Sequence, residues 1–350
     1  MSVHVYQIEK DLAHEWDNLV KANRCSGFMQ SWAWGEFKKR EGQKVIRLGL
    51  LKDGEIIGGS SIYFVQSSLG TSPFEIPHGP VINWDSKGAM EDLAALQNEW
   101  GRLASMKCVP LIRVAPLISV EKVNPFADIP RAPMDLVPTP TTVIFLSGSE
   151  DDILKRMKEK GRYNIHRGMK LGVEVTHGNA VDLLDDFYRL FELSAVRHDF
   201  LSEPKSFFIN LLSTLNDSNM AELFFARYHG VLVASALIIF YGNKATYLYG
   251  GTLPFLKSSM AAYVLHWEVM LAARRRGCLF YDLYGVAPEG QQFHPYRRFT
   301  QFKTRFGGEY QSYIGARDIY FYPELARLWA KSIQKGVFYA FDRTGGHIDL

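Results

Sequence analysis

The sequence carries an internal repeat, and this repeat limits the possible folds more than any other feature. The segment DGEIIGGSSIYF (53–64) aligns without gaps with HGVLVASALIIF (229–240), at an offset of 176 residues. A second pair, MEDLAALQNEWGRLASMKC (90–108) and MAAYVLHWEVMLAARRRGC (260–278), aligns at an offset of 170. Chance likeness between two amphipathic hairpins is the alternative, but the same kinds of element flank both copies in the same order. A period this long is no solenoid, and it predicts one domain fold used twice.

The hydrophobic periodicity predicts similar elements in both halves. In the first half, it predicts helices over 9–22, 30–41 and 88–107, and strands over 45–51, 55–65 and 109–115. In the second half, it predicts helices over 151–170, 181–197, 204–216 and 257–276, and strands over 220–228, 231–241, 244–251 and 279–284.

This order of elements indicates an α+β fold with mixed central sheets flanked by helices. It fits tandem GNAT-like (acyl-CoA N-acyltransferase-like) domains. We expect the first domain to comprise 1–145 plus 317–350, and the second to comprise 146–316.

Composition excludes several classes of protein. The chain has 350 residues, of which 47% are hydrophobic and 22% charged, so disordered and fibrous classes are excluded. The three cysteines, Cys25, Cys108 and Cys278, are far apart, which argues against a disulfide framework and a CxxC metal pair. No stretch approaches the roughly 20 apolar residues of a membrane span, and the opening residues do not form a signal peptide. We therefore expect a soluble cytoplasmic protein.

The usual nucleotide and metal motifs are missing from the sequence. It contains no GxxxxGK[ST] loop, GxSxG elbow, HExxH pair or GxGxxG turn. The GNAT phosphate loop, Q/R-x-x-G-x-G/A, is also missing, and GGTLPFLKSSMAA (250–262) at its expected place lacks the pattern. That loop would cradle the pyrophosphate of coenzyme A at a helix N-terminus. The sequence therefore does not support an ordinary coenzyme A donor, and it predicts neither a cofactor nor a metal.

Basic residues gather in two segments, although the net charge of the whole chain is only +3. The segment 151–170 holds seven Lys/Arg against three Asp/Glu, with Tyr163 and His166 among them. Cations interleaved with aromatic rings can hold a nucleic acid through phosphate contacts and stacking. A solvated helix face with Glu/Lys pairs is the alternative. The candidate RNA contacts are Lys155, Arg156, Lys160, Arg162 and Arg167.

The second basic segment, 294–309, combines cations with a regular row of aromatic residues. Phe299, Phe302 and Phe306 recur at three- and four-residue spacing, which is typical of the buried face of a helix. Lys303 follows Phe302 directly, so it projects beside this face. A Lys at that edge suits a cleft, and snorkelling to solvent is the alternative.

Three further motifs contain candidate site residues. In VRHDF (196–200), Arg197 can act as a phosphate fork, and His198 and Asp199 are either an acid–base pair or a surface cap. In TYLYGG (246–251), Tyr247 and Tyr249 should point to one face of a strand, where they line a polar pocket or pack in the core. In QSWAWGEFKKR (30–40), Lys38 should lie over the ring of Trp34 at i,i+4 spacing.

These segments together resemble the Fem family, also called FemABX, of non-ribosomal peptidyltransferases. Seven motifs occur in the family's order: QSWAWGEFK, HGPVI (78–82), RYNIHRGMKLGVEV (162–175), RHDF followed by EPKSFF (203–208), TYLYGGT, YDLYGV (281–286) and FKTRFGGE (302–309). The resemblance spans nearly the whole chain and implies two tandem GNAT-like domains. The chain lacks a long charged heptad insertion, so it resembles the smaller FemX-like members without the coiled-coil arm.

The resemblance implies a reaction of peptidoglycan synthesis and interpeptide-bridge formation. An aminoacyl-tRNA gives its amino acid to the stem-peptide amine of a precursor, either UDP-MurNAc-pentapeptide or its lipid-linked form. The first domain would bind the precursor, and the second would be the catalytic and tRNA side. The implied catalytic residues are Lys303, Tyr247 and Tyr249, and the implied substrate-binding residues are Lys38, Arg197, Arg113 and Phe302. One position departs from the family pattern, because Ala115 stands where family members can carry an acidic residue.

The implied partners are aminoacyl-tRNA and the precursor, without DNA. We expect a monomer that associates peripherally with the inner membrane face if its acceptor is lipid-linked. Two other classes remain open. One is a GNAT-like N-acyltransferase that uses another acyl donor on a small amine, and the other is a non-catalytic RNA-binding module.

Overall fold

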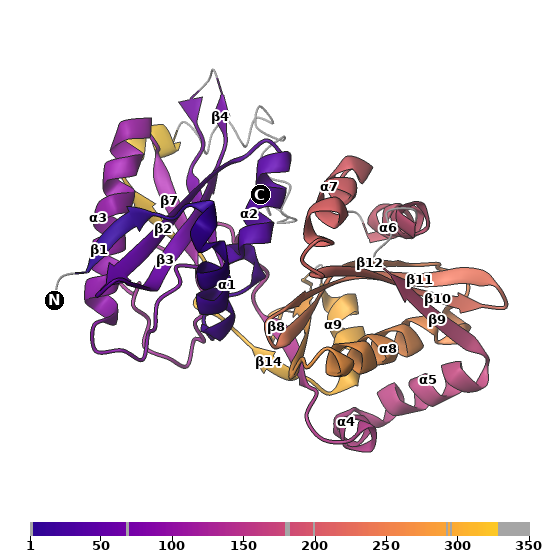
Figure 1. Cartoon of the computed structure of the whole chain (residues 1–350). Helices are drawn as coiled ribbons and strands as arrows, with labels where there is room; N and C mark the ends of the chain where they lie inside the picture. Colours follow the sequence, from indigo (N-terminus) through magenta and orange to yellow (C-terminus); the bar gives the residue numbers. More distant parts are fainter. Residues whose placement is uncertain are drawn as a thin grey trace. The chain divides into compact units, whose positions relative to one another are not determined.

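The computed structural model describes residues 3–67, 70–178, 183–198, 200–291, 293–294 and 296–327. The chain forms two compact units, and each is built around its own sheet (Figure 1). Unit 2 is Pro138–Ser312, and unit 1 consists of the described parts of Met1–Val137 and Tyr313–Leu350. The chain thus leaves unit 1 and returns to it a few residues earlier than the sequence-derived boundaries at 145 and 317.

Unit 1 holds a six-stranded sheet with α3 on one face and α1 and α2 on the other (Figure 1). In sheet order, its strands are β1 (His4–Gln7), β2 (Lys44–Lys52), β3 (Glu55–Phe64), β6 (Phe74–Pro77), β7 (Leu111–Ala115) and β15 (Arg317–Tyr320). Its helices are α1 (Ala13–Ala22), α2 (Trp32–Arg40) and α3 (Ala89–Lys107), with 3-10 turns at Lys10–Leu12 and Phe28–Gln30. A separate two-stranded ribbon pairs β4 (Gln66–Ser67) with β5 (Gly70–Thr71).

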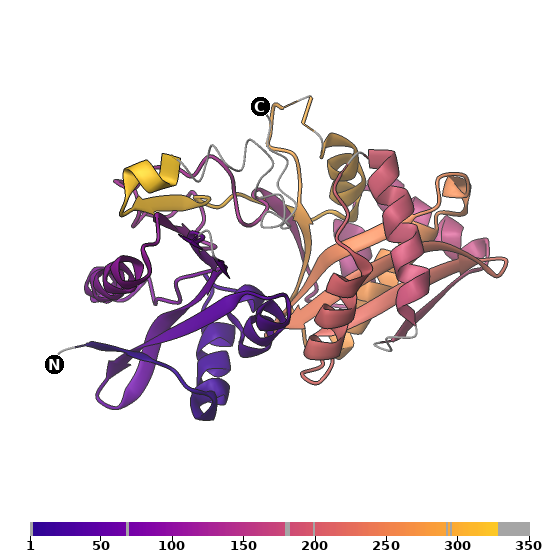
Figure 2. The same ribbon diagram turned by 90° about the horizontal axis from the view of Figure 1, so that it is seen from above.

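Unit 2 holds a seven-stranded sheet. In sheet order, its strands are β14 (Glu309–Gln311), β8 (Thr141–Phe145), β13 (Phe280–Gly285), β12 (Lys244–Thr252), β11 (Val231–Tyr241), β10 (Ala221–Tyr228) and β9 (Val173–Gly178). One face carries α4 (Glu150–Arg156), α5 (Glu159–Lys170), α8 (Ala261–Arg275) and α9 (Arg297–Lys303). The other face carries α6 (Leu184–His198) and α7 (Lys205–Leu215), which lie side by side across the strands (Figure 2). Short 3-10 turns occupy Lys257–Ser259 and Thr304–Phe306.

The sequence repeat corresponds to a structural repeat. Both hairpins turn through two left-handed residues, Asp53-Gly54 and His229-Gly230. Both second strands also carry a bulge, at Ile57 in β3 and at Val233 in β11, and these two positions are again 176 residues apart. In each unit the strand after the hairpin then pairs in parallel with the strand that follows the long helix, as β6 with β7 and β12 with β13.

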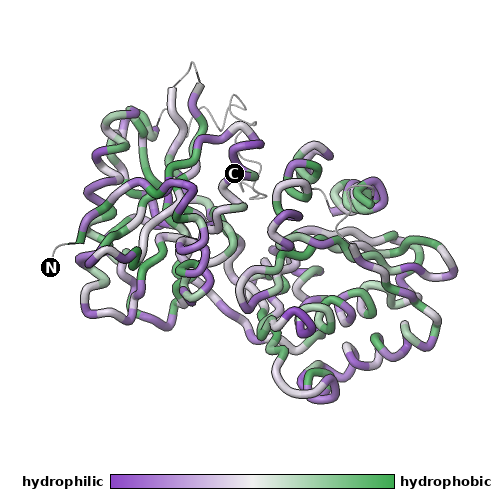
Figure 3. Tube along the Cα trace, viewed as in Figure 1, coloured by the Kyte–Doolittle hydropathy of each residue, from purple (hydrophilic) through white to green (hydrophobic). Residues whose placement is uncertain are grey.

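The helix predicted over 151–170 is two helices. α4 begins with a capping box between Ser149 and Asp152, and it ends at Arg156. Met157 and Lys158 are extended, so the chain bends there before α5 begins. α5 is mostly hydrophilic (Figure 3). It packs closely against the 3-10 turn that follows α9, because a Cβ at Gly161 would collide with the backbone of Arg305.

The core of unit 2 lies between its sheet and the helices α5 and α8. α8 contributes many buried residues, and the apolar strands β11 and β10 contribute most of the opposing surface. This packing holds the ends of β12 and β13 in place beneath α9. In the described part of the chain, no helix has the length and apolar character needed to cross a membrane.

Candidate active site at the fork of β12 and β13

The two parallel strands β12 and β13 separate after a short paired stretch. They pair only over Lys244–Thr246 and Phe280–Asp282. Beyond this point both strands are irregular. β12 has a bulge at Leu248 opposite β11, and β13 skips Leu283 and Tyr284 in its pairing with β8. Bulges change the direction of side chains and are common beside active sites, so this fork positions side chains that a regular sheet would point elsewhere.

Lys303 enters the fork from the last residue of α9. Its side chain is only 9% exposed. Its ammonium donates hydrogen bonds to the carbonyl of Gly285 at 2.7 Å and to that of Tyr284 at 3.3 Å. Burial lowers the pKa of Lys303 to about 7, while the charge of Asp282 acts in the opposite direction. No carboxylate among the described residues forms an ion pair with this ammonium, so its charge is available for a bound group.

Aromatic residues line the same side of the fork. The Lys303 Nζ lies 5.7 Å from the centre of the Tyr247 ring, and this ring meets His266 edge-on at 4.7 Å. Burial raises the pKa of Tyr247 to about 12, so its phenol stays neutral at physiological pH. Burial, followed by the charge of Lys303, lowers the pKa of His266 to about 3, so this imidazole is also neutral. His266 Nδ1 shares a hydrogen bond of 2.7 Å with the Tyr281 hydroxyl.

The prediction that Tyr247 and Tyr249 share one face of β12 is wrong. Tyr249 packs edge-on against Phe191 and Phe208 at 5.5 and 5.2 Å, so it faces α6 and α7, whereas Tyr247 faces α8 and α9. The bulge at Leu248 is the physical reason, because one extra residue reverses the alternation of side chains. Burial raises the pKa of Tyr249. Tyr249 is thus a half-buried residue packed against α6 and α7, on the other face of β12 from Tyr247.

Phe302 belongs to the core rather than to an open surface. Its ring lies 5.0 Å from Tyr263, 5.2 Å from Phe306 and 5.4 Å from His266. This packing fixes the end of α9 and therefore the starting point of the Lys303 side chain. The substrate-binding role implied for Phe302 would be exerted through this packing.

Arg197 stands at the end of α6, on the face of the sheet that Tyr249 occupies. Its guanidinium donates to both the carbonyl and the hydroxyl oxygen of Thr252 at 2.9 Å. Within the described ranges, Arg197 has no carboxylate partner. Burial lowers the pKa of His198, and the charges of Arg197, Arg298 and Lys257 lower it further, so cations converge here. Asp199, the other half of the suggested acid–base pair, lies outside the described residues.

Lys38 lies at the end of α2 in unit 1. Ser31 caps the start of this helix, accepting a hydrogen bond from the Trp34 amide at 3.1 Å. The Lys38 Nζ lies 5.7 Å from the rings of both Trp34 and Phe37, as the i,i+4 spacing predicts for Trp34. Its side chain is 9% exposed. Lys38 is therefore a largely buried cation above an aromatic surface.

Arg113 is engaged inside the sheet of unit 1, and the substrate contact implied for it stays a prediction. It forms two hydrogen bonds with Asp318 of the adjacent strand, at 2.7 and 2.8 Å. The side chains of Arg113 and Asp318 are 3% and 1% exposed. Such a bidentate pair uses up the charge of both groups. Arg113 therefore ties β7 to β15, and Ala115, two residues further, is buried beside it.

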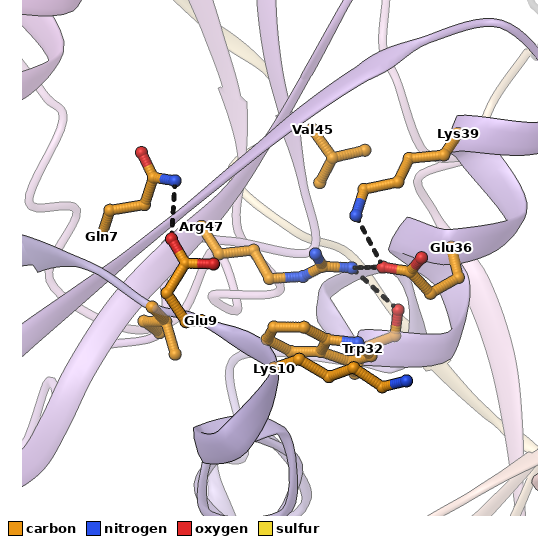
Figure 4. Close-up of a pocket in the computed structure, with 9 residues that line it drawn as sticks. Gln7, Glu9, Lys10, Trp32, Glu36, Lys39, Val45 and Arg47 are labelled. Carbon is orange, nitrogen blue, oxygen red and sulfur yellow. Dashed lines mark hydrogen bonds and ion pairs between the residues drawn. The ribbon is translucent and has the colours of Figure 1, made fainter.

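A pocket of about 290 Å³ opens in unit 1 between β1, β2 and α2 (Figure 4). Arg47 crosses its floor, where its guanidinium stacks 3.8 Å from the centre of the Trp32 ring and donates to Glu36 at 2.9 Å. Lys39 pairs with the same carboxylate. Two of the cations of this pocket thus share one acid of the pocket, and none of the predicted site residues lines it.

The basic residues of α4 and α5 differ in their contacts and in their exposure. Arg156 donates to the carbonyls of Phe145 and Ser147, and Arg162 donates to those of Met157 and Lys155, so these two side chains fix the helix ends. The exposed basic residues of the segment are Lys155, Arg156, Lys158, Lys160, Arg167 and Lys170. Arg167 contacts the Tyr163 hydroxyl at 3.1 Å. Of the predicted RNA contacts, Arg162 is half-buried and the others lie at the surface.

Sequence reasoning assigned no role to several residues around Lys303. These are His266, Tyr281, Asp282 and Thr141. The signal that could have found two of them is the motif YDLYGV, which the family resemblance includes without a role for its acid. Among the residues that the structure describes, no group of three or more His, Cys, Asp or Glu is placed to hold a metal ion.

Comparison with solved structures defines the class of protein. The fold matches a crystal structure of FemX with a TM-score of 0.83, over 93% of this chain and 99% of that chain, at 19% sequence identity. A tandem GNAT protein from the clavulanic acid biosynthesis pathway matches with a TM-score of 0.53, over 91% of this chain and 97% of that one, at 9% identity. The chain therefore has the tandem GNAT fold with two mixed sheets, as the repeat predicted.

The family model described as the FemAB family matches residues 12–135, 131–229 and 218–331. Lipid II:glycine glycyltransferases of Staphylococcus haemolyticus and Staphylococcus aureus are 20% and 21% identical over 384 aligned residues, covering 87% of this chain and 90% of theirs. The chain belongs to the FemAB family, and it is a transferase involved in peptidoglycan synthesis.

Proposed function

We propose that this protein transfers an amino acid from aminoacyl-tRNA to the stem-peptide amine of a peptidoglycan precursor. The observation that carries the proposal is the buried Lys303 ammonium at the fork of β12 and β13, with no carboxylate paired to it in the described part of the chain. The similarity of the protein to lipid II:glycine glycyltransferases, along most of both chains, supports the choice of substrates. The missing GNAT phosphate loop argues for a donor other than coenzyme A.

The reaction does not require a nucleophile from the enzyme. The donor is an ester, and the acceptor amine attacks its carbonyl carbon to form a tetrahedral intermediate with a negatively charged oxygen. Collapse of this intermediate re-forms the carbonyl and breaks the ester C–O bond, and the proton lost by the amine is taken up by the departing ribose oxygen of the tRNA. In our proposal, the Lys303 ammonium stabilises the oxyanion, and the neutral rings of Tyr247 and His266 exclude water around it.

Other cations would hold the phosphates of the two substrates. Arg197 and Lys38 are the proposed contacts of the precursor's phosphates, because each is a largely buried or half-buried cation that can form charge-assisted hydrogen bonds. The exposed Lys155, Lys160 and Arg167 are the proposed contacts of tRNA. In this scheme unit 2 carries the catalytic Lys303 and the tRNA contacts.

A donor test distinguishes this proposal from acyl transfer with another donor. The purified protein is incubated with a UDP-linked or lipid-linked precursor and with either charged tRNA or an acyl thioester. We expect amide formation only with charged tRNA, and ribonuclease treatment of the donor should abolish it. Turnover with the thioester and indifference to ribonuclease would overturn the proposal.

The advantage of the wild-type enzyme over a Lys303→Met variant should fall as pH rises through about 7. The ammonium form of Lys303 is the active form in this mechanism, and its pKa is lowered to about 7 by burial. The fraction of enzyme with a protonated Lys303 is therefore nearly complete well below pH 7 and decreases about tenfold for each further pH unit well above it. The measurement is the ratio of kcat/KM between the two proteins from pH 5.5 to 9, because the titration of the acceptor amine and the stability of the donor ester affect both proteins equally. A ratio that keeps rising up to pH 9 would show that the neutral amine of Lys303 is the active form.

A further inference from the structure

Asp282 is a buried acid next to the fork, and the mechanism above leaves it without a role. It lies on β13 between Thr246 of β12 and Val143 of β8, and it is 6% exposed. Its Oδ1 accepts hydrogen bonds from the Thr141 hydroxyl and, at 2.8 Å, from the backbone N–H of Tyr284. Burying a carboxylate in a sheet costs free energy unless hydrogen bonds compensate it. The two donors to one oxygen of Asp282 supply this compensation and fix the position of its side chain.

The backbone that Asp282 holds is in an unusual conformation. Tyr284 has a φ of +60°, a left-handed conformation that bulky residues rarely adopt. The hydrogen bond from the Tyr284 N–H back to the Asp282 side chain stabilises such a turn. Gly285 follows, where a Cβ would lie 2.8 Å from Pro138 and 3.0 Å from the Tyr296 ring. Both residues therefore bend the chain sharply at the end of β13.

This turn presents two carbonyl oxygens to Lys303. The carbonyls of Tyr284 and Gly285 accept the hydrogen bonds of the ammonium. Between Asp282 and Gly285 the pairing of β13 with β8 shifts register, so the turn sets the direction of these carbonyls. The chain of contacts thus runs from Thr141 to Asp282, from Asp282 to the Tyr284 amide, and from the turn to the Lys303 Nζ.

Asp282 also sets the electrostatic surroundings of the ammonium. The groups that act on Lys303 are Tyr247 from β12, His266 from α8 and Asp282 from β13, and Tyr281 of β13 hydrogen-bonds to His266. Burial keeps the two phenols and the imidazole neutral at pH 7. Asp282 is the one acid in this set, and its charge favours the protonated form of Lys303 against the effect of burial.

We propose that Asp282, anchored by Thr141, is a positioning residue that holds the Tyr284–Gly285 turn and keeps the Lys303 ammonium charged in the fork. The inference deepens the proposed function and rests on it for its kinetic consequences. The placement of the ammonium by Asp282 can be measured without any substrate, so the two proposals can fail separately.

The first test measures Lys303 directly. The protein is treated with a small amine-reactive reagent, acetic anhydride, across a pH series, and modification of Lys303 is followed by mass spectrometry. Asp282→Asn keeps the shape of the side chain and removes its charge. We expect the midpoint of modification to move about one pH unit lower, since a nearby opposite charge commonly shifts a pKa by one unit or more. Asp186→Asn, on the exposed surface of α6, is the control and should leave the midpoint unchanged.

The second test measures transfer. In Asp282→Asn, the pH profile of kcat should move downward by the same amount, which lowers the rate at pH 7 about fivefold and restores much of it at pH 6. Thr141→Val should lower kcat with little change in KM, and Thr141→Ser should restore it, because the serine hydroxyl still donates to Asp282. These two Thr141 variants also apply if Asp282→Asn fails to fold. An unchanged midpoint, or full activity in Thr141→Val, would overturn the inference. A shifted midpoint in a protein that transfers nothing would preserve it and overturn the proposed function.

Discussion

Replacing Lys303 by alanine should lower kcat for aminoacyl transfer by about 10²- to 10³-fold. This is the effect of removing one donor from an oxyanion site, about 3–4 kcal/mol of transition-state stabilisation. The change should appear in kcat more than in KM, because the oxyanion exists only in the transition state and the intermediate. The measurement is steady-state transfer at pH 6.5, where most of the ammonium is present in the wild type.

Two controls separate this effect from a loss of structure. Lys303→Met keeps most of the buried volume, so its melting temperature should stay at or above that of the wild type while its kcat falls as in the alanine variant. Lys52→Ala, exposed at the end of β2, should leave kcat unchanged. If Lys303→Met transfers at the wild-type rate, the ammonium has no part in catalysis, and the chemistry assigned to the fork is wrong.

Replacing Asp318 by alanine should lower the free energy of unfolding by about 3–5 kcal/mol. The substitution removes the bidentate partner of the buried Arg113 guanidinium, and breaking a buried ion pair has this cost. Denaturant unfolding followed by circular dichroism is the measurement. Asp85→Ala removes the acid of an exposed pair with Lys122 and should cost less than about 1 kcal/mol.

The double variant Arg113→Met/Asp318→Leu tests the same ion pair by removing both of its charges. Replacing both charges with apolar side chains removes the unpaired ion, so most of the lost stability should return. A similar small loss for Asp318→Ala and Asp85→Ala would contradict the structural role given to Arg113. In that case a contact between Arg113 and substrate would again need testing.

The repeat was the part of the fold most open to prediction from sequence. Long apolar strands and a two-residue turn with Gly give a strong local signal, and the copies even share a bulge at Ile57 and Val233. The short strands β1, β8, β9, β14 and β15 gave no such signal, because strands of three to six residues at a sheet edge or next to it depend on long-range pairing. The break at Met157 and Lys158 was missed because the charge pattern continues across it.

The site was predictable where one residue's environment follows from its neighbours. Lys303 sits beside an aromatic stripe in the sequence, and the structure buries it next to that stripe. Tyr249 was misplaced because a bulge cannot be read from alternation alone. Asp282 and His266 were missed because their meaning lies in contacts with Thr141, Tyr281 and Lys303, which are 15 to 141 residues away from them in the chain.

The most direct test of the account is the mass of the precursor after reaction. The wild-type protein is incubated with a panel of charged tRNAs and, separately, with the nucleotide-linked and lipid-linked precursors. The account predicts that one form gains the mass of one amino acid residue on its stem-peptide amine, and that the gain disappears when the tRNA ester is hydrolysed beforehand. An unchanged precursor mass with every charged tRNA and both acceptors, from a folded protein, would contradict it.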